Sequence, residues 1–341
     1  MAKKRRSPFP YPAARAVQPR PPPPHVPPLP DARPRIRLGP LLVGSAFLYV
    51  GAASVTYYVA AEKKKASALA AAKAAGRDNA ENTIDPNTFD TQSVWNRIAP
   101  TYDRDVGTDE FWIGLGLFRR WLLRHAKGDV LEVSAGTGRN LSYYVPNQIT
   151  SLTLTDRSAS MLSEAQSKFS EYSQKFHSVF VSFQAADAER LDTLSPPPVT
   201  TTTATTPSYP VKYDTVVDTF GLCSCRDPVV ALVSLARACR SSDGSRILLL
   251  EHGRSRWKWL NRLLDAQAVK HAERWGCWWN RDMVELLERE EVKEELEVLY
   301  LKRWHLGTTY YIVARPKKRE GQEGVGAEKE TEKETEKENK I

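Results

Sequence analysis

The sequence predicts one α/β domain built on a seven-stranded sheet that is mostly parallel and ends in a β-hairpin. Short apolar runs alternate with amphipathic helical patterns such as 160–175 and 229–240, which is typical of parallel strands joined by helices. Five runs are expected as parallel strands: Val130–Ser134, Ser151–Thr155, Val179–Gln184, Asp214–Phe220 and Arg246–Glu251. Two more, Glu295–Leu301 and Thr308–Ala314, flank a short connection around Gly307 and predict the hairpin.

Composition supports one folded domain between charged ends. The chain has 341 residues, 41% of them hydrophobic and nine of them Trp, which is enough for a sizeable core. Four Cys do not make a disulfide framework. The net charge is +8, and residues 1–37 alone contain nine Lys or Arg against one acid, Asp31. Because a nucleic-acid-binding domain carries its positive charge on the folded surface, no nucleic-acid partner is expected.

The N-terminal segments predict targeting and membrane insertion. Residues 1–37 are basic and Pro-rich, which favours a mitochondrial transit peptide over a cytosolic tail. Residues 38–61 contain no charge, and their 24 residues reach about 36 Å as a helix, enough to cross a bilayer. A buried core helix and a signal-peptide apolar region are the alternatives. Basic residues flank both sides, so the orientation of this transmembrane helix stays open.

The remaining boundaries follow from shifts in composition. Residues 62–92 are Ala- and Lys-rich and then polar, as in a stalk or linker, and the globular domain is expected over 93–316. Residues 195–210 are rich in Pro and Thr and predict a loop inserted in that domain. The tail 317–341 contains an EKET repeat and is expected to be a disordered, solvated charge run.

A glycine-rich turn follows the first predicted strand. The stretch Asp129–Gly138 reads as a strand and a turn, followed by a helix from about Arg139. Ligands of open α/β sheets bind at the carboxyl ends of the strands, where Gly136 and Gly138 allow the backbone to approach them. A dinucleotide fingerprint needs a third glycine three residues later, but Leu141 stands there. The turn therefore suits a ligand without a pyrophosphate.

Two carboxylates follow the next two strands. Asp156 ends the second strand and can accept both hydroxyls of a ribose, although it could also cap a helix. Asp187 follows the third strand, where it can accept from an exocyclic amine or serve as an ordinary turn residue. Together with the glycine-rich turn, these positions predict S-adenosylmethionine as the cofactor.

Several motifs support a family resemblance. The blocks Glu132–Gly138, Thr155–Leu162 and Asp187–Leu191 resemble the UbiE-like branch of class I methyltransferases, which have a Rossmann-like sheet closed by a hairpin. The opening 95–103 block is similar to the helix that closes over the cofactor in that branch. The blocks 251–254 and 275–282 resemble the Oms-type methyltransferases, fungal proteins with one N-terminal span in the mitochondrial inner membrane.

This resemblance implies roles for individual residues. Glu132 would orient the motif loop or contact the methionine amino group, Asp156 would hold the ribose, and Asp187 would bind the adenine amine. The full implied cofactor set is Glu132, Ser134, Ala135, Gly136, Gly138, Asp156, Arg157, Met161, Asp187, Ala188, Phe220, Gly221 and Leu222. Ser134 departs from the glycine usual in the family, and its small side chain is expected to be tolerated.

The methyl-transfer chemistry points to two further groups. His252, at the end of the fifth strand, is the candidate general base, with a backbone-bonded structural histidine as the alternative. Trp275, Trp278, Trp279 and Arg281 could line a substrate pocket or pack a lid helix. Cys223 and Cys225 form a C-x-C that does not match zinc-ligand spacing, so they are interpreted as small buried residues and no metal is expected.

The sequence thus predicts a single-pass methyltransferase of the mitochondrial inner membrane. Its expected partners are membrane lipid, through residues 38–61, a methyl acceptor and inner-membrane proteins. A small hydrophobic or quinone-type acceptor is favoured over a protein or thiol acceptor. The alternative from another class is a non-catalytic assembly or quality-control factor that keeps the fold as a binding module. The domain could face the matrix or the intermembrane space.

Overall fold

The computed structural model describes residues 60, 67, 85–194 and 212–318 of the chain. The predicted targeting arm 1–37 and inserted loop 195–210 lie outside these residues, as do all but residue 60 of the span 38–61 and nearly all of the tail 317–341. Most of the predicted linker 62–92 is also outside them. Among the described residues, no helix has both the length and the apolar character that a membrane span requires.

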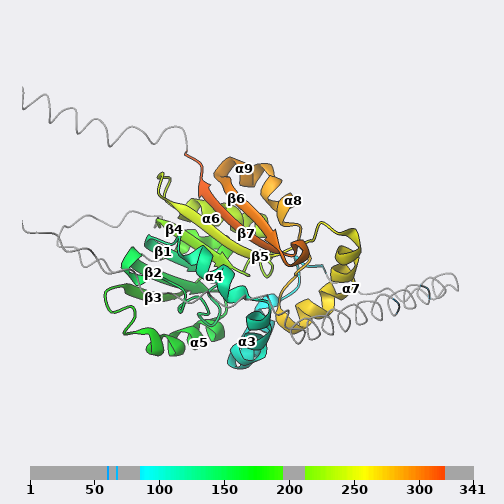
Figure 1. Ribbon diagram of the computed structural model, residues 1–341, viewed down its shortest axis with the longest axis horizontal. Coiled ribbons are helices and arrows are strands. Elements are labelled where there is room, and N and C mark those ends of the chain that lie inside the picture. Colours follow the sequence, from blue (N-terminus) through cyan, green and yellow to red (C-terminus); the bar gives the residue numbers. More distant parts are fainter. Residues whose placement is uncertain (1–59, 61–66, 68–84, 195–211, 319–341) are drawn as a thin grey trace, which may run out of the picture. The chain divides into compact units, whose positions relative to one another are not determined.

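The domain is organised around one mixed sheet of seven strands (Figure 1). Its strands are β1 Gly128–Val133, β2 Ile149–Asp156, β3 Phe180–Ala185, β4 Thr215–Thr219, β5 Arg246–His252, β6 Leu296–Trp304 and β7 Thr309–Pro316. They lie in the order β3-β2-β1-β4-β5-β7-β6. Strands β1 to β5 pair in parallel, whereas β7 runs antiparallel to both β5 and β6. The predicted parallel core and terminal hairpin are confirmed.

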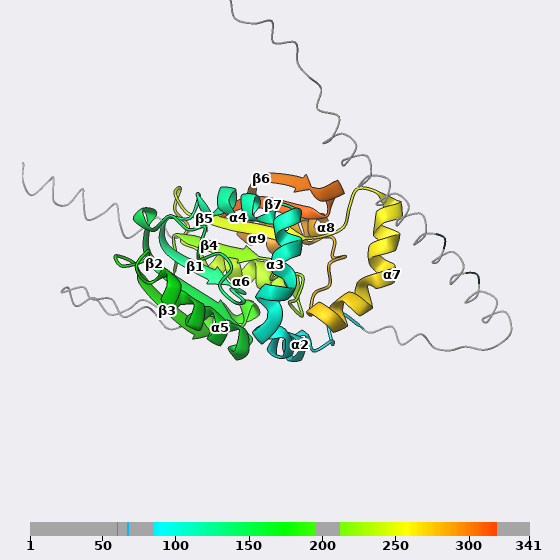
Figure 2. The ribbon, with the colours of Figure 1, turned by 60° about the horizontal axis from the view of Figure 1, so that its bottom comes forward.

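The helices fill the connections and the N-terminal approach to the sheet. The α-helices are α2 Thr91–Ile98, α3 Tyr102–Trp112, α4 Leu115–Leu123, α5 Ala159–Phe169, α6 Pro228–Ala238, α7 Lys258–Trp275, α8 Met283–Glu288 and α9 Glu290–Glu295. Short 3-10 helices are η1 Ala99–Thr101, η2 Pro146–Gln148, η3 Ser170–Tyr172, η4 Ala188–Thr193 and η5 His305–Gly307. Figure 2 shows α2 and α3 beyond the carboxyl ends of the parallel strands.

Alternate strand residues supply two cores, one on each face of the sheet. Leu131 and Val216 face a core completed by α6, α8, α9 and η4. Their neighbours Val130 and Val217 face a second core, to which α4 contributes Leu122. Because both faces are covered, the central strands are apolar almost throughout. Polar side chains interrupt these strands near their carboxyl ends, and two of them, Glu132 and Asp156, line a cavity there.

One predicted element is absent from this region. The chain after the glycine-rich turn was expected to form a helix from about Arg139, but residues 136–143 form successive turns. Backbone bonds run from Gly138 to Ala135, from Leu141 to Gly138 and from Tyr143 to Asn140. Positive φ angles at Gly136 (54°) and Gly138 (72°) interrupt a helical path. This prediction was wrong because the glycines turn the chain away from helical geometry.

Candidate active site

A cavity lies at the carboxyl ends of β1, β2 and β4, where ligands of open α/β sheets bind. Its empty space measures about 850 Å³, part of it open to solvent. Ten of the residues predicted to hold the cofactor line it: Glu132, Ser134, Ala135, Gly136, Asp156, Arg157, Asp187, Ala188, Phe220 and Gly221. Residues from α2, α3 and α4 complete the walls, namely Thr91, Gln92, Trp95, Tyr102 and Arg119.

Three predicted cofactor residues stand behind the lining. Met161 is buried in α5, and Leu222 packs into the core beneath α6. Gly138 allows the motif loop to approach α5, because a Cβ there would come within 2.9 Å of Leu141 and 3.3 Å of Ala165. These residues support the wall of the cavity without lining it.

The backbone of the motif loop forms a cradle. Gly136 lines the cavity, and a Cβ built on it meets no atom within 4 Å, so a side chain there would occupy the open space. Ser134 has a φ of 51°, in the left-handed region that favours glycine. This backbone conformation explains why glycine is the usual residue at this position in the family. Serine occupies the position at the cost of backbone strain.

Asp156 receives backbone hydrogen bonds on both oxygens. The amide of Gly136 donates to one oxygen at 2.8 Å, and the amide of Ser158 donates to the other at 2.7 Å. Burial nevertheless raises the pKa of Asp156 to about 6. Each oxygen retains a further acceptor site. The carboxylate is thus fixed in position and can still accept two hydroxyl groups, as the ribose of S-adenosylmethionine requires.

Asp187 lies at the next strand end and forms an ion pair across the cavity rim. One oxygen caps η4 by accepting from the amide of Glu189 at 3.0 Å, and the other lies 3.5 Å from Arg157. Asp187 also lines the cavity. Its position is therefore compatible with both predicted roles, the turn residue and the acceptor of an adenine amine.

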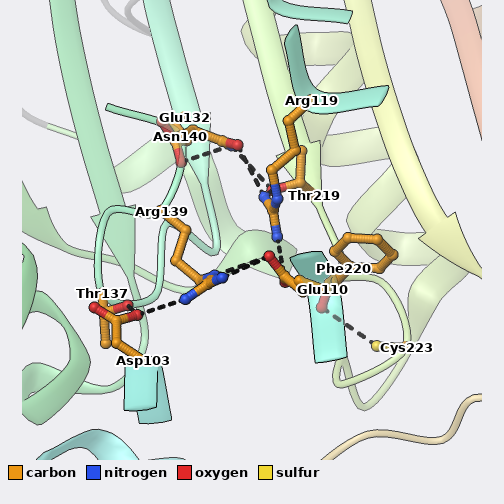
Figure 3. A network of polar contacts seen from close by, with 10 residues as sticks. All are labelled: Asp103, Glu110, Arg119, Glu132, Thr137, Arg139, Asn140, Thr219, Phe220 and Cys223. Atoms are coloured by element: carbon orange, nitrogen blue, oxygen red, sulfur yellow. Dashed lines mark hydrogen bonds and ion pairs between the residues drawn. The ribbon is translucent and has the colours of Figure 1, made fainter. Parts of the chain in front are cut away.

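Glu132 anchors a buried polar network next to the cradle (Figure 3). Its oxygens accept from Asn140 at 3.0 Å and from Tyr144 at 2.7 Å. Burial raises the pKa of Glu132 to about 7, despite these hydrogen bonds. Asn140 in turn accepts from Arg119 at 2.8 Å. Since the hydrogen-bond partners of Glu132 and Asp156 are neutral, a cationic ligand such as S-adenosylmethionine would offset both charges.

Helix α3 is fastened over the motif loop by ion pairs, as Figure 3 shows. Asp103 accepts from Thr137 at 2.6 Å and from Arg139 at 3.0 Å, and it also pairs with Lys168. Glu110 binds Arg139 at 2.7 Å, at the other end of the helix. We call these contacts the α3 latch. The resemblance of the block 95–103 implies a helix that closes over the cofactor, and Asp103 is the last residue of that block. The resemblance did not indicate the partners of Asp103 and Glu110.

Glu110 also binds a second arginine, from α4. Arg119 lies 2.9 Å from Glu110 and 3.0 Å from the hydroxyl of Thr219, and only 4% of its side chain is exposed. Burial would raise the pKa of Glu110, but Arg119 and Arg139 lower it below its ordinary value. Glu110 is therefore ionised at neutral pH and holds both arginines at the cavity wall.

A second pair of carboxylates lies on the opposite face of the sheet. Asp218 in β4 and Glu251 in β5 are both fully buried. Burial raises the pKa of Asp218 to about 8, and the charges of Asp156 and Glu132 add to the effect. Burial and the charge of Asp218 raise the pKa of Glu251 well above its ordinary value. Ser134 and the Gly221 amide approach Asp218, but neither completes a well-formed hydrogen bond to its oxygens.

Replacing Asp218 with asparagine is expected to change the pH dependence of stability. A carboxyl group whose folded pKa is raised holds its proton in the folded chain while the unfolded chain has lost it. Stability therefore falls by about 1.4 kcal/mol per pH unit between the unfolded pKa near 4 and the folded pKa. Denaturant unfolding between about pH 5 and pH 8 should show a smaller decline for Asp218→Asn. An unchanged decline would contradict the assignment, and exposed Asp192→Asn is the control.

His252 lies behind the cavity wall rather than in its lining. Its ring packs on Phe220, with 4.5 Å between the ring centroids, and its Nδ1 atom lies 3.5 Å from the Cys277 sulfur. Phe220 itself lines the cavity with a φ of 61°. Such a backbone conformation in a bulky residue is typical of functional sites. The general-base role of His252 stays a prediction.

The predicted substrate-pocket residues surround the turn after α7, and none lines this cavity. Trp278 is buried against Phe89, and Trp279 stacks on His271 at 3.8 Å and donates to the carbonyl of Leu264. Trp275 contacts Tyr102, which is itself a lining residue. Arg281 donates to the carbonyls of Cys223 and Cys225. Their contact with an acceptor stays a prediction.

Comparison with known proteins places this site in a family. A family profile described as a methyltransferase domain matches residues 112–292. The mitochondrial methyltransferase OMS1 of Saccharomyces cerevisiae is 41% identical over 228 residues, which cover 67% of this chain and 46% of that protein. The chain thus spans about half the length of this curated relative.

Two of the solved structures that match the chain carry the cofactor or its product. The DhpI–SAM–HEP complex matches with a TM-score of 0.45 and 19% identity, over 69% of this chain and 100% of that one. Magnesium protoporphyrin IX methyltransferase from Synechocystis PCC 6803, with bound SAH, matches with a TM-score of 0.40 and 15% identity, over 66% and 86%.

The matched profile covers all five parallel strands and the whole cradle. The predictions of an Oms-type methyltransferase and of S-adenosylmethionine as cofactor are confirmed at the level of the family. The chain belongs to the methyltransferase-domain family.

Proposed function

We propose that this protein is a membrane-anchored, S-adenosylmethionine-dependent methyltransferase of the mitochondrial inner membrane. Its acceptor is a small hydrophobic molecule, of which a quinone-type ring is one class. The mitochondrial relative supports the location, and the uncharged segment 38–61 supports the anchor. The observation that carries the activity is the cavity with an open glycine cradle at Gly136 and a fixed, accepting carboxylate at Asp156.

The residues of the cavity supply position and charge. Bound S-adenosylmethionine supplies a methyl group on an electrophilic sulfonium, so the acceptor needs only to be held in line with it. Asp156 would bind the ribose, and Asp187 would bind the adenine amine. Glu132 faces the end of the cavity nearest β1, where it would favour an ammonium group. The α3 latch would exclude water from the bound cofactor.

An apolar acceptor is supported by the face next to the α3 latch. Large hydrophobic side chains are exposed on α3 and α4 and on the η5 turn. We call this set the aromatic face: Phe111, Trp112, Ile113, Leu117, Trp121 and Leu306. Trp112 is 78% exposed, and His305 bonds the carbonyl of Ile113 at 2.9 Å, which joins η5 to the end of α3.

The aromatic face has the character of a membrane-interface surface. Trp is enriched where a protein meets lipid headgroups, and basic side chains favour anionic lipid. Arg120, next to Trp121 in the chain, and Arg124 are exposed near the carboxyl end of α4. A domain tethered by an N-terminal span could rest this face on the bilayer and take its acceptor from the lipid phase.

A dye at position 112 is expected to report lipid contact. The full chain carrying Trp112→Cys would be labelled with a polarity-sensitive dye and reconstituted into liposomes that contain anionic lipid. The dye should emit as in an apolar environment and be severalfold protected from an aqueous quencher. The matched control is Asp192→Cys, exposed on η4 and away from the aromatic face. Equal quenching at both positions would count against the membrane face.

The activity itself is tested by calorimetry and by methyl transfer. The full chain in detergent should bind S-adenosylmethionine, and Gly136→Arg should abolish binding because its side chain fills the cradle. Labelled methyl groups should then appear in the lipid fraction of a mitochondrial extract. Label in the protein fraction would redirect the proposal to a protein acceptor. Binding without any transfer would favour the non-catalytic module, and a folded chain that fails to bind would refute the enzyme.

A further inference from the structure

Three potential metal ligands meet just behind the cavity wall. Cys223 lies in the loop after β4, His252 ends β5, and Cys277 lies in the turn between α7 and α8. Their donor atoms all lie within 4.8 Å of one another. The two sulfurs are 2.9 Å apart, and the Cys277 sulfur lies 3.5 Å from Nδ1 of His252. The fold thus gathers residues that are far apart in the sequence.

The ligand types and spacings suit a tetrahedral soft metal ion. Thiolate sulfur and imidazole nitrogen are the ligands that Zn²⁺ prefers in proteins. With Zn–S near 2.3 Å and Zn–N near 2.0 Å, a tetrahedral site sets sulfur and nitrogen about 3.5 Å apart. That is the distance from Cys277 to His252. Two sulfurs should lie about 3.8 Å apart, so one cysteine side chain would move outward by about 1 Å.

The surrounding structure already holds the ligands in place. The carbonyl of Cys223 accepts from the Trp278 amide at 2.9 Å and from Arg281 at 3.3 Å. The ring of His252 packs on Phe220, which fixes its plane. Cys223 and Cys277 are almost completely buried, at 1% and 4% exposed. In Figure 3 the sulfur of Cys223 lies beside Phe220, on the far side from the polar network.

We propose that Cys223, His252 and Cys277 bind one Zn²⁺ ion, with water at the fourth position. On binding, each thiol releases its proton to solvent and each sulfur forms one bond to the metal, so the two thiolates neutralise the dication. No net charge is then added near the buried pair Asp218 and Glu251. In this assignment His252 is a ligand rather than the general base expected from the sequence.

The ion would brace one wall of the active-site cavity. Phe220, Ser224 and Cys225 line the cavity, and Cys223 stands between them in the chain. Coordination would tie this loop to β5 and to the turn after α7. Cys277 comes from the Trp-rich block 275–282, so this block would have a metal-binding role beside any contact with the acceptor.

The test measures metal content and not turnover. The full chain would be purified in detergent with a reductant and without chelators, and its metals measured by mass spectrometry. We expect about one zinc per chain, and a thiolate-to-cobalt charge-transfer band when Co²⁺ replaces zinc. Cys223→Ser and Cys277→Ser should each lower zinc affinity at least tenfold. The matched control is Cys239→Ser, which should retain the metal. Cys239 is also buried, but its thiol donates to the carbonyl of Asp214.

Two results would overturn the site. The first is a folded wild-type chain with substoichiometric zinc and no cobalt band, a result that does not depend on any variant folding. The second is a Cys223–Cys277 disulfide in the chain as purified, with zinc content unaffected by the substitutions. Calorimetry with S-adenosylmethionine is independent of both measurements. Failure of the metal site is therefore distinguishable from failure of the proposed enzyme.

Discussion

Replacing Arg119 with methionine is expected to lower the free energy of unfolding by about 3–5 kcal/mol. Methionine keeps most of the apolar stem but removes the guanidinium that binds Glu110, Asn140 and Thr219. Asn140 and Thr219 would each lose a buried hydrogen-bond partner, and Glu110 would keep only its ion pair with Arg139. The measurement is denaturant unfolding at neutral pH, followed by circular dichroism.

The neighbouring residue offers a matched control for this substitution. Arg120 follows Arg119 in α4 but is exposed, so Arg120→Met should change stability by less than about 0.5 kcal/mol. Glu110→Gln should cost less stability in the Arg119→Met background than in the wild type, because one of the two ion pairs of Glu110 is already lost there. If Arg119→Met cost no more than Arg120→Met, the guanidinium would not hold the wall together.

Replacing Asp156 with asparagine is expected to weaken S-adenosylmethionine binding by about 100-fold or more. Hydrogen bonds to a charged group contribute about 1.5–3 kcal/mol each, and both ribose hydroxyls would lose their charged acceptor, one of them facing an NH₂ group instead. In addition, Asp156 accepts from the backbone N–H groups of Gly136 and Ser158. The NH₂ group of asparagine would face one of these two N–H groups. Two donors facing each other would disturb the cradle.

Isothermal calorimetry measures this loss, and unfolding curves check that the variant is folded. Asp192→Asn changes an exposed aspartate on η4 and should bind as the wild type does. A loss below tenfold, in a folded Asp156→Asn chain, would remove Asp156 from the ribose site. The cofactor would then have to lie elsewhere along the strand ends.

The predicted residues that the structure places around the cavity share one property. Asp156 is the last residue of β2 and Asp187 lies two residues after β3, and the carboxyl ends of parallel strands meet at one edge of the sheet. Because the end of an apolar strand can be recognised in the sequence, the positions of these two residues can be predicted from local patterns. The helix expected from Arg139 failed for the opposite reason. Its composition allows a helix, but the positive φ of Gly136 and Gly138 does not.

The residues that were missed depend on contacts between distant segments. Arg119 is an arginine within the apolar stretch of α4, and Asp218 is an acid within apolar β4. Each is a polar residue where the pattern calls for an apolar one, which is the signal that could have marked it. Their partners could not be read from the sequence. Cys277 likewise meets Cys223 only because the turn after α7 returns to β4.

The α3 latch has a consequence for the timing of each catalytic cycle. In the proposed enzyme, we expect S-adenosylmethionine to enter and leave past α3, which requires the contacts of Asp103 and Glu110 with Arg139 to break. The opening of α3, and not the bond-making step, would then set the rate at which spent cofactor leaves. Because the Asp103 side of the latch is partly exposed, dissolved salt weakens it. Raising the ionic strength is therefore expected to shorten the residence time of the cofactor by loosening α3, without any change in the cavity that holds it.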